Sequence, residues 1–361
     1  MPSRLSLRLG QLPHNVLAEL AARLCSDSPA LQAAAEECMA AHTPLPHEMV
    51  ERVLLSPDLV PHLLGPLVAE DGAAAAVCSQ WLAGWKATNE PRRRLKQVPL
   101  YFPAELVTCG LSMAGTPDGR LVVREGHKVH ILDSNMRVLQ RMPGFNRGFI
   151  AASDDSLFYA SYIPPVLRRS SHEGTLAAEY QLEDYHFHSL VLAPGGLLFC
   201  VIYMAADDHR DEIVALDAQT LQLRHRFGRG LLNDAGQLAV AGDELYVCDT
   251  CNHRLQVFSL SGEHRRSITG EWRSPWLLCC VKDRIYLVEE DDGAPLQGRR
   301  VLVLSLQGDI LQVVTHPTEP TAKFQSICCF DCKLLATYRY WTEESAGTPT
   351  RKCGMLALQG L

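Results

Sequence analysis

Beyond about residue 100, short apolar runs alternate with turn residues at regular intervals. Six runs, PDGRLVV, DDSLFYA, GGLLFCV, GDELYVC, KDRIYLV and DCKLLAT, are each followed by a second apolar run. Aligned on Leu121, Leu157, Leu198, Leu245, Ile285 and Leu334, the first runs are 36, 41, 47, 40 and 49 residues apart. A period near 40 residues with several strands per repeat is typical of a β-propeller. The sequence therefore predicts six blades over residues 101–361.

The strands of such a ring are buried on both faces, because blades stack face to face. Continuous apolar runs such as LYVC and LQVF fit this arrangement better than strict alternation does. A single blade cannot hide both of its faces, whereas a closed ring can. We therefore expect residues near 94–100 to supply the outer strand of the last blade and so close the ring.

The N-terminal quarter of the chain has a helical period instead. Residues 16–24 place four apolar side chains on one helical face, and Ser28-Pro29 and Pro46 are helix start signals. The predicted fold class is thus α plus all-β, a multidomain chain with an N-terminal helical module and a C-terminal six-bladed β-propeller. Its parts are a helical segment over 1–55, a helical motif over 56–90, a basic connector over 91–100 and the propeller.

The composition is that of a globular protein, with 47% hydrophobic and 21% charged residues among 361. A net charge of −7 argues against general binding of nucleic acid, which needs a surplus of Lys and Arg. Thirteen cysteines without a framework of even spacings indicate reduced thiols and a location in the cytoplasm or the nucleus. The uncharged stretch 189–206 contains Pro194-Gly195-Gly196, so two strands around a turn are expected there, not a membrane span.

The segment YVCDTCNHRLQVFSLSG, residues 246–262, can be interpreted in two ways. Cys248, Cys251 and His253 could begin a zinc site, but a closed site needs four ligands and no second C-x-x-C follows at zinc-ribbon spacing. The alternative is two strands around a tight turn with buried thiols, and we favour it. No metal and no cofactor are expected.

The same segment resembles the NHL repeat of propeller proteins. The pattern D-x-x-N-x-R, followed by L-Q-V-F and a glycine, places Asp249, Asn252 and Arg254 at the matching positions. The resemblance implies that these three residues are structural, and Arg254 is expected within reach of Asp249 across the hairpin. The other five repeats share only the rhythm.

Residues 56–86, SPDLVPHLLGPLVAEDGAAAAVCSQWLAGWK, resemble an F-box. In that family a short helical unit docks on the Skp adaptor of cullin–RING ubiquitin ligases, helix against groove. The resemblance implies that the adaptor-docking residues are Pro57, Leu59, Leu63, Leu64 and Leu67. The alternative is a helical cap that packs on the propeller, since apolar stripes more often form core than interface.

Three long loops after the second strand of a blade are expected on one face of the ring. Long loops on a rigid scaffold are common recognition sites, and aromatic and Arg side chains are good interface anchors. The predicted partner-binding face comprises Asp207, Asp208, Glu290, Asp291, Tyr338, Arg339, Tyr340 and Trp341. The alternative is that the acidic members are only solvated turns.

We therefore interpret the chain as the substrate-recognition adaptor of a Skp–cullin–F-box ubiquitin ligase, without an active site of its own. A second hypothesis is a propeller scaffold that binds RNA or protein, with Arg147, Arg224, His225, Arg226 and Arg229 as a basic patch. A third is a metal-dependent propeller hydrolase or lactonase, with Asp207, Asp208, Glu289 and Glu290 as ligands and His186 and His188 nearby. No G-x-S-x-G, Walker or H-E-x-x-H motif supports catalysis.

Overall fold

The computed structural model describes residues 93–103, 112–143, 148–161, 163–204, 211–290, 298–343 and 349–360, and the single residues 60, 64, 83, 84 and 106. The chain divides into two units, Met1–Lys96 with Gly360–Leu361, and Gln97–Gln359. The helices expected over 1–90 lie outside the described residues apart from four single positions. Among the residues from 93 to 360 that are described, the regular elements are strands and one short 3₁₀-helix, η3 (Thr250–Asn252).

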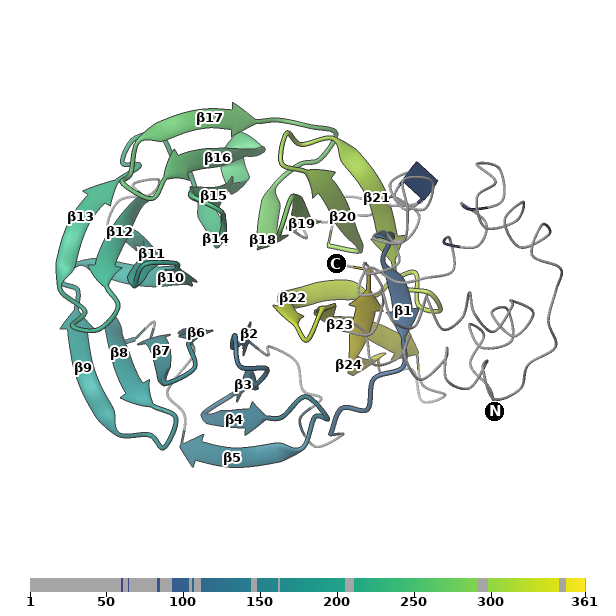
Figure 1. Ribbon diagram of the computed structural model, residues 1–361, viewed down its shortest axis with the longest axis horizontal. Helices are drawn as coiled ribbons and strands as arrows, with labels where there is room; N and C mark the ends of the chain where they lie inside the picture. Colours follow the sequence, from purple (N-terminus) through teal and green to yellow (C-terminus); the bar gives the residue numbers. More distant parts are fainter. Residues whose placement is uncertain are drawn as a thin grey trace, which may run out of the picture. The chain divides into compact units, whose positions relative to one another are not determined.

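The strands form six four-stranded antiparallel sheets around a central channel (Figure 1), so the predicted six-bladed propeller is confirmed. Blade 1 comprises β2 (Ser112–Gly115), β3 (Leu121–Glu125), β4 (Lys128–Leu132) and β5 (Val138–Pro143). Blade 2 comprises β6 (Gly148–Ala152), β7 (Ser156–Ser161), β8 (Val166–Ser171) and β9 (Leu176–Gln181). Blade 3 comprises β10 (Tyr185–Ala193), β11 (Leu197–Met204), β12 (Glu212–Asp217) and β13 (Leu223–Phe227).

The second half of the ring continues the same order from the innermost to the outermost strand. Blade 4 comprises β14 (Ala235–Ala241), β15 (Glu244–Asp249), β16 (Arg254–Ser259) and β17 (His264–Ile268). Blade 5 comprises β18 (Pro275–Val281), β19 (Arg284–Glu289), β20 (Arg300–Ser305) and β21 (Ile310–Thr315). Blade 6 comprises β22 (Lys323–Phe330), β23 (Lys333–Glu343), β24 (Pro349–Gln359) and, outermost, β1 (Lys96–Val98). A strand that precedes blade 1 in the sequence thus completes the last blade and closes the ring.

Each apolar run is double-sided because its alternate residues face two different neighbours. On β15, Leu245 and Val247 belong to a cluster with strands of blade 3, whereas Tyr246 and Cys248 belong to a cluster with strands of blade 5. All four side chains are fully buried. The hydrophobic core is therefore a series of seams between blades, and no blade can fold its apolar faces away without both neighbours.

A tight turn between the third and fourth strands recurs around the ring. In blade 4 the N–H of Ser259 donates to the carbonyl of Glu263, and the N–H of Gly262 donates to that of Ser259. Blade 5 repeats this turn with glycine at the same place, Gly308. Blade 1 has Met136 there at φ 61°, so a left-handed residue is required by the turn even where glycine is absent.

Residues 189–204 of the uncharged stretch belong to two strands, β10 and β11, joined by a turn in which Gly195 and Gly196 have positive φ. This confirms the expected strand–turn–strand arrangement. Among the described residues, no helix has the length and the apolar character needed to cross a membrane.

Candidate binding site at one face of the propeller

The η3 segment of blade 4 is organised around one buried carboxylate. Asp249 is fully buried at the end of β15, and its oxygens accept hydrogen bonds from Arg254 Nε at 2.7 Å and Asn252 Nδ2 at 2.9 Å. The backbone N–H of Asn233 donates at 2.8 Å and Gln256 Nε2 at 3.2 Å. The structure therefore brings Asp249, Asn252 and Arg254 together, and ties them to the segment that leads into the innermost strand.

Blade 5 contains an equivalent centre that the sequence pattern did not reveal. Glu289 ends β19, is buried, and accepts from Arg300 Nε at 2.7 Å and from the backbone N–H of Arg273 at 3.0 Å. Arg300 begins β20 just as Arg254 begins β16. Eleven residues separate this acid–base pair, against five in blade 4, so a longer loop hides the repeat.

The thiols of the η3 segment lie in different environments. Cys248 is buried in the apolar seam between blades 4 and 5, whereas Cys251 is exposed and its Sγ lies 3.8 Å from Asp234 Oδ2. His253 Nδ1 accepts the N–H of Ser274 at 3.1 Å. Among the described residues, no group of three or more His, Cys, Asp or Glu side chains is arranged to hold a metal ion.

Other cysteines change one expectation drawn from the sequence. Eight of the described cysteines are free thiols, and Cys279 and Cys329 on neighbouring innermost strands have their sulfurs 3.0 Å apart. Cys353 on β24, however, is disulfide-bonded, so the prediction that the cysteines are reduced is wrong at this position.

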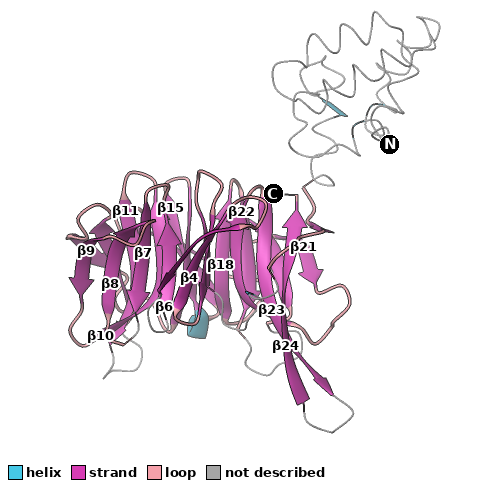
Figure 2. Ribbon diagram, turned by 90° about the horizontal axis from the view of Figure 1, so that it is seen from below, coloured by secondary structure: helices cyan, strands magenta, loops and turns pink. Residues whose placement is uncertain are grey.

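One face of the ring carries η3, the loops between second and third strands, and the β23–β24 hairpin (Figure 2); we call it the η3 face. Tyr338, Arg339, Tyr340 and Trp341 do not lie in a loop as expected, but on β23, paired with residues 351–354 of β24. Both strands of this hairpin are eleven residues long and extend past the ring (Figure 2). Trp341 lies near the end of β23, and its side chain is 59% exposed. The expected loop is thus a long two-stranded arm.

The remaining residues of the predicted partner-binding face divide into two groups. Glu290 follows β19 on the η3 face, and its backbone N–H donates to the carbonyl of Ser274. Asp207, Asp208 and Asp291 lie outside the described residues.

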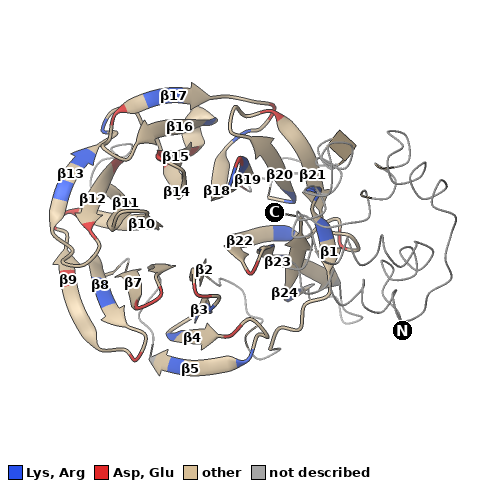
Figure 3. Ribbon diagram, in the orientation of Figure 1, with Lys and Arg blue, Asp and Glu red and all other residues tan. Residues whose placement is uncertain are grey.

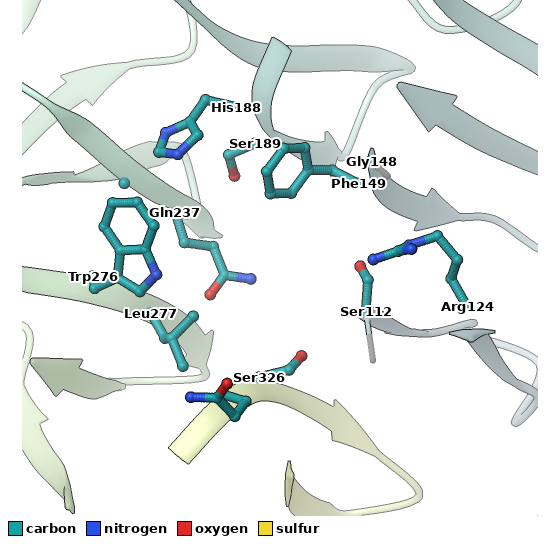
Figure 4. A pocket seen from close by; sticks show the side chains of 12 residues that line it. Ser112, Arg124, Gly148, Phe149, His188, Ser189, Gln237, Trp276, Leu277 and Ser326 are labelled. Atoms are coloured by element: carbon teal, nitrogen blue, oxygen red, sulfur yellow. The ribbon is translucent and has the colours of Figure 1, made fainter. Parts of the chain in front are cut away.

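A cavity of about 210 Å³ occupies the channel at the η3 face, and we call it the channel cavity (Figure 4). All six innermost strands contribute to it, each near the end where it leaves the η3 face. Its described lining residues are Ser112, Arg124, Gly148, Phe149, His188, Ser189, Gly236, Gln237, Trp276, Leu277, Gln325 and Ser326. None of them carries a carboxylate, and Arg124 of β3 is the one with a permanent charge. No sequence pattern indicates this set, because each repeat contributes only one or two of its members.

Several of these side chains are held in place by the backbone of neighbouring blades. His188 Nδ1 lies 2.6 Å from the carbonyl oxygen of Ala235, and the His188 ring meets Trp276 edge-on with centroids 4.9 Å apart. Gln237 Oε1 accepts the N–H of Leu278 at 2.8 Å. The Gln237 amide and the Arg124 guanidinium project into the cavity from opposite sides (Figure 4).

The electrostatics of the cavity and of its surroundings differ in sign. Burial lowers the pKa of Arg124, because the charged guanidinium loses water. Burial raises the pKa of Asp211, which accepts the N–H of Ala235 and feels the nearby charges of His188, Asp234 and Asp249. The cavity is thus cationic, and its border at blades 3 and 4 is acidic.

The basic residues considered for RNA binding lie mostly on an outermost strand and not on a face. Lys and Arg residues are distributed over the outer strands of several blades, β13 among them (Figure 3). Arg224 pairs with Asp217 at 2.6 Å, and Arg226 pairs with Glu212 at 3.1 Å. Two of the proposed phosphate contacts are therefore partly neutralised by carboxylates of the same blade, whereas Arg147 lies outside the described residues.

Of the adaptor-docking residues, Leu64 is described, and its side chain is fully buried. Pro57, Leu59, Leu63 and Leu67 lie outside the described residues.

Comparison with known proteins supports the propeller fold. The NHL repeat family matches residues 232–258. This range contains η3 and the first three strands of blade 4, except for Ser259, the last residue of β16. Comparison with curated protein sequences gives no significant match. The chain is thus a six-bladed β-propeller in which blade 4 matches the NHL repeat.

Among solved structures, the calcium-binding protein regucalcin from Agrobacterium tumefaciens is 15% identical, with a TM-score of 0.50 over 74% of this chain and 94% of that one. A protein from Bacteroides caccae is 9% identical, with a TM-score of 0.47 over 60% of this chain and 82% of that one. The WD40 propeller domain of Doa1 is 13% identical, with a TM-score of 0.46 over 68% and 77%. At these identities the likeness to regucalcin concerns the fold alone.

Proposed function

We propose that this protein is a non-enzymatic recognition adaptor whose propeller binds a protein partner at the η3 face. The observation that carries the proposal is the β23–β24 arm, which presents Tyr340, Arg339 and the exposed Trp341 at the η3 face. Trp, Tyr and Arg are enriched among the few residues that carry most of the binding energy of protein interfaces. The η3 face thus offers a partner both a projecting surface, the arm, and a concave one, the channel cavity.

A metal-dependent propeller hydrolase or lactonase is less well supported. Calcium takes six to eight oxygen ligands, usually with several carboxylates among them. The described lining of the channel cavity supplies hydroxyl and amide oxygens but no carboxylate, and it contains a buried guanidinium that repels cations. A general RNA-binding role is also less favoured, because Arg224 and Arg226 are partly neutralised by carboxylates of their own blade.

The more specific part of the proposal concerns the ligase. The F-box-like residues 56–86 would dock on the Skp adaptor of a cullin–RING ligase, and the propeller would select the protein to be ubiquitinated in the cytoplasm or nucleus. Docking rests on the sequence resemblance. Since Leu64 is fully buried in the free chain, Leu59 and Leu63 are the better positions for a test.

The experiment is affinity capture of the full chain from its native cells, followed by mass spectrometry, with three variants. Leu59→Asp with Leu63→Asp should lose the Skp adaptor and keep the propeller's partner. Trp341→Ala should do the reverse. Leu139→Ala on β5 is a matched control, because Leu139 is also 59% exposed but lies on an outer strand away from the arm. A wild type that captures no partner sensitive to Trp341→Ala would refute the recognition role, and one without a Skp adaptor would refute the ligase role alone.

A further inference from the structure

The channel cavity has the size of one or two side chains and is smaller than a pocket for a drug-sized ligand. Pockets for drug-sized ligands have volumes of roughly 300–1,000 Å³, and the channel cavity has about 210 Å³. Its walls come from the six innermost strands and β3 of a closed ring, so its shape is set by the fold and not by a mobile loop. It is therefore built to admit a short group that projects from a larger molecule.

The cavity is rich in hydrogen-bond donors. Arg124 projects its guanidinium inward, and its Nη1 donates to the carbonyl of Gly126 at 3.1 Å. The oxygen of the Gln237 amide is occupied by the N–H of Leu278, so the amide nitrogen is the end left to donate. Ser189 already accepts the N–H of Leu238 at 3.2 Å, so its hydroxyl hydrogen remains to be donated. Donors with a buried cation, and no carboxylate among the described lining, favour an anionic acceptor.

The wall opposite Arg124 is aromatic. Trp276 lies against His188, and Phe149 contacts the same imidazole edge-on with centroids 5.6 Å apart. Such a wall suits the methylene groups of a carboxylate-bearing side chain, whose charged end would then reach the guanidinium across the cavity.

We propose that the channel cavity is the anchor site for a single glutamate or aspartate side chain of the partner protein. The inference rests on the proposed recognition function and names the chemistry that the site selects. The carboxylate is bound by Arg124 and Gln237, and its stem packs on Trp276.

The acidic border of the cavity restricts the sequence around that carboxylate. Asp211 lies next to His188, and both contact Ala235. The carboxylate accepts the N–H of Ala235, and the imidazole Nδ1 lies 2.6 Å from its carbonyl oxygen. With Asp234 close by, this border repels a second negative charge. The favoured ligand is an isolated carboxylate with neutral or basic neighbours, not an acidic run.

The test titrates the ¹⁵N-labelled full chain with N-acetyl-glutamate amide and, as the isosteric neutral control, with N-acetyl-glutamine amide. The readout is the indole N–H signal of Trp276, assigned by Trp276→Phe among the five tryptophans. We expect a saturable shift with the glutamate probe and binding of the glutamine probe about tenfold to a hundredfold weaker, the range of one charge-assisted hydrogen bond. The signal of Trp341 on the arm should not move.

Two substitutions with opposite effects test the charges. Arg124→Gln should abolish the preference for glutamate, and Arg124→Lys should restore part of it. Asp211→Asn should strengthen binding of the glutamate probe. This variant keeps Arg124, so it tests the proposal even if replacement of Arg124 disturbs folding. The signal of Trp272, buried between blades 4 and 5, reports whether each variant is folded.

The proposal is overturned if Trp276 does not respond to the glutamate probe, if both probes bind equally, or if Asp211→Asn weakens the binding. Its failure is distinguishable from failure of the recognition function. Capture that depends on Trp341 would persist without a carboxylate anchor, and binding of the glutamate probe would persist in a chain that captures no partner.

Discussion

Removal of the Asp249 carboxylate should be among the most damaging single substitutions in the propeller. Asp249→Ala breaks a buried ion pair with Arg254 and leaves the N–H of Asn233 and the amide of the buried Gln256 without their acceptor. Breaking a buried pair costs about 3–5 kcal/mol, and an orphaned buried donor about 1–3 kcal/mol. Arg254, 31% exposed, recovers part of its hydration. We therefore expect a loss of about 3–5 kcal/mol in the free energy of unfolding.

The assay is equilibrium unfolding of the full chain in guanidinium chloride, followed by the indole N–H signal of Trp272, which is buried between blades 4 and 5. The control is Asp243→Asn in the same blade, whose carboxylate is 79% exposed and pairs with Arg265. It should leave the midpoint unchanged, because exposed ion pairs contribute little. A loss below about 1 kcal/mol for Asp249→Ala would refute the reasoning, since it would mean that water replaces the carboxylate without cost.

Three further outcomes follow from the same contacts. Glu289→Gln should lower the free energy of unfolding more than substitution of an exposed acidic residue does in the same assay, because Glu289 occupies the place in blade 5 that Asp249 has in blade 4. A loss no larger than that of the exposed substitution would mean that the Glu289 and Asp249 centres are not equivalent. The hydrogen bond with Arg266 lowers the pKa of Glu244 from 4.5 to about 2, so its contribution is fully present above pH 4.5 and is lost as the pH falls toward 2. Glu244→Gln should thus cost on the order of 1–2 kcal/mol at pH 7, after discounting for solvent screening, and a cost independent of pH would contradict this. Burial and the neighbouring carboxylate of Asp234 raise the pKa of the Cys251 thiol, so Asp234→Asn should speed its alkylation by iodoacetamide at pH 7.5, as measured by mass spectrometry of the labelled peptide; an unchanged rate would show that the carboxylate does not act on the thiol.

The second strand of every blade was predictable because it is buried on both sides. The alignment residues, from Leu121 to Leu334, all lie on these strands, and a double-sided apolar run is visible without knowledge of its neighbours. The outermost strands were not predictable in this way. β13, with the sequence LRHRF, and β17, with HRRSI, are mostly exposed and carry too few apolar residues to show a period.

The Asp249 centre was visible because its members lie within six residues of one another, so local spacing carries the signal. Glu289 and Arg300 make the same contact across a loop of variable length, which removes that spacing. Tyr338 to Trp341 were mistaken for a loop because aromatic residues next to TEESAGTP read as an exposed turn, and only their pairing with β24 identifies an arm.

Neither a double-sided apolar run nor the local spacing of motif residues indicates the channel cavity, for a physical reason. Its chemistry depends on which single residue each innermost strand turns toward the axis, and a bulge decides this in at least two blades. In β10 the register shifts between Phe187 and Ser189, and in β22 between Phe324 and Ser326. A one-residue shift exchanges the side chains on the two faces of a strand. His188 and Gln325 therefore line the cavity because of local irregularities of the backbone, and a regular register would direct other residues toward the axis at these places.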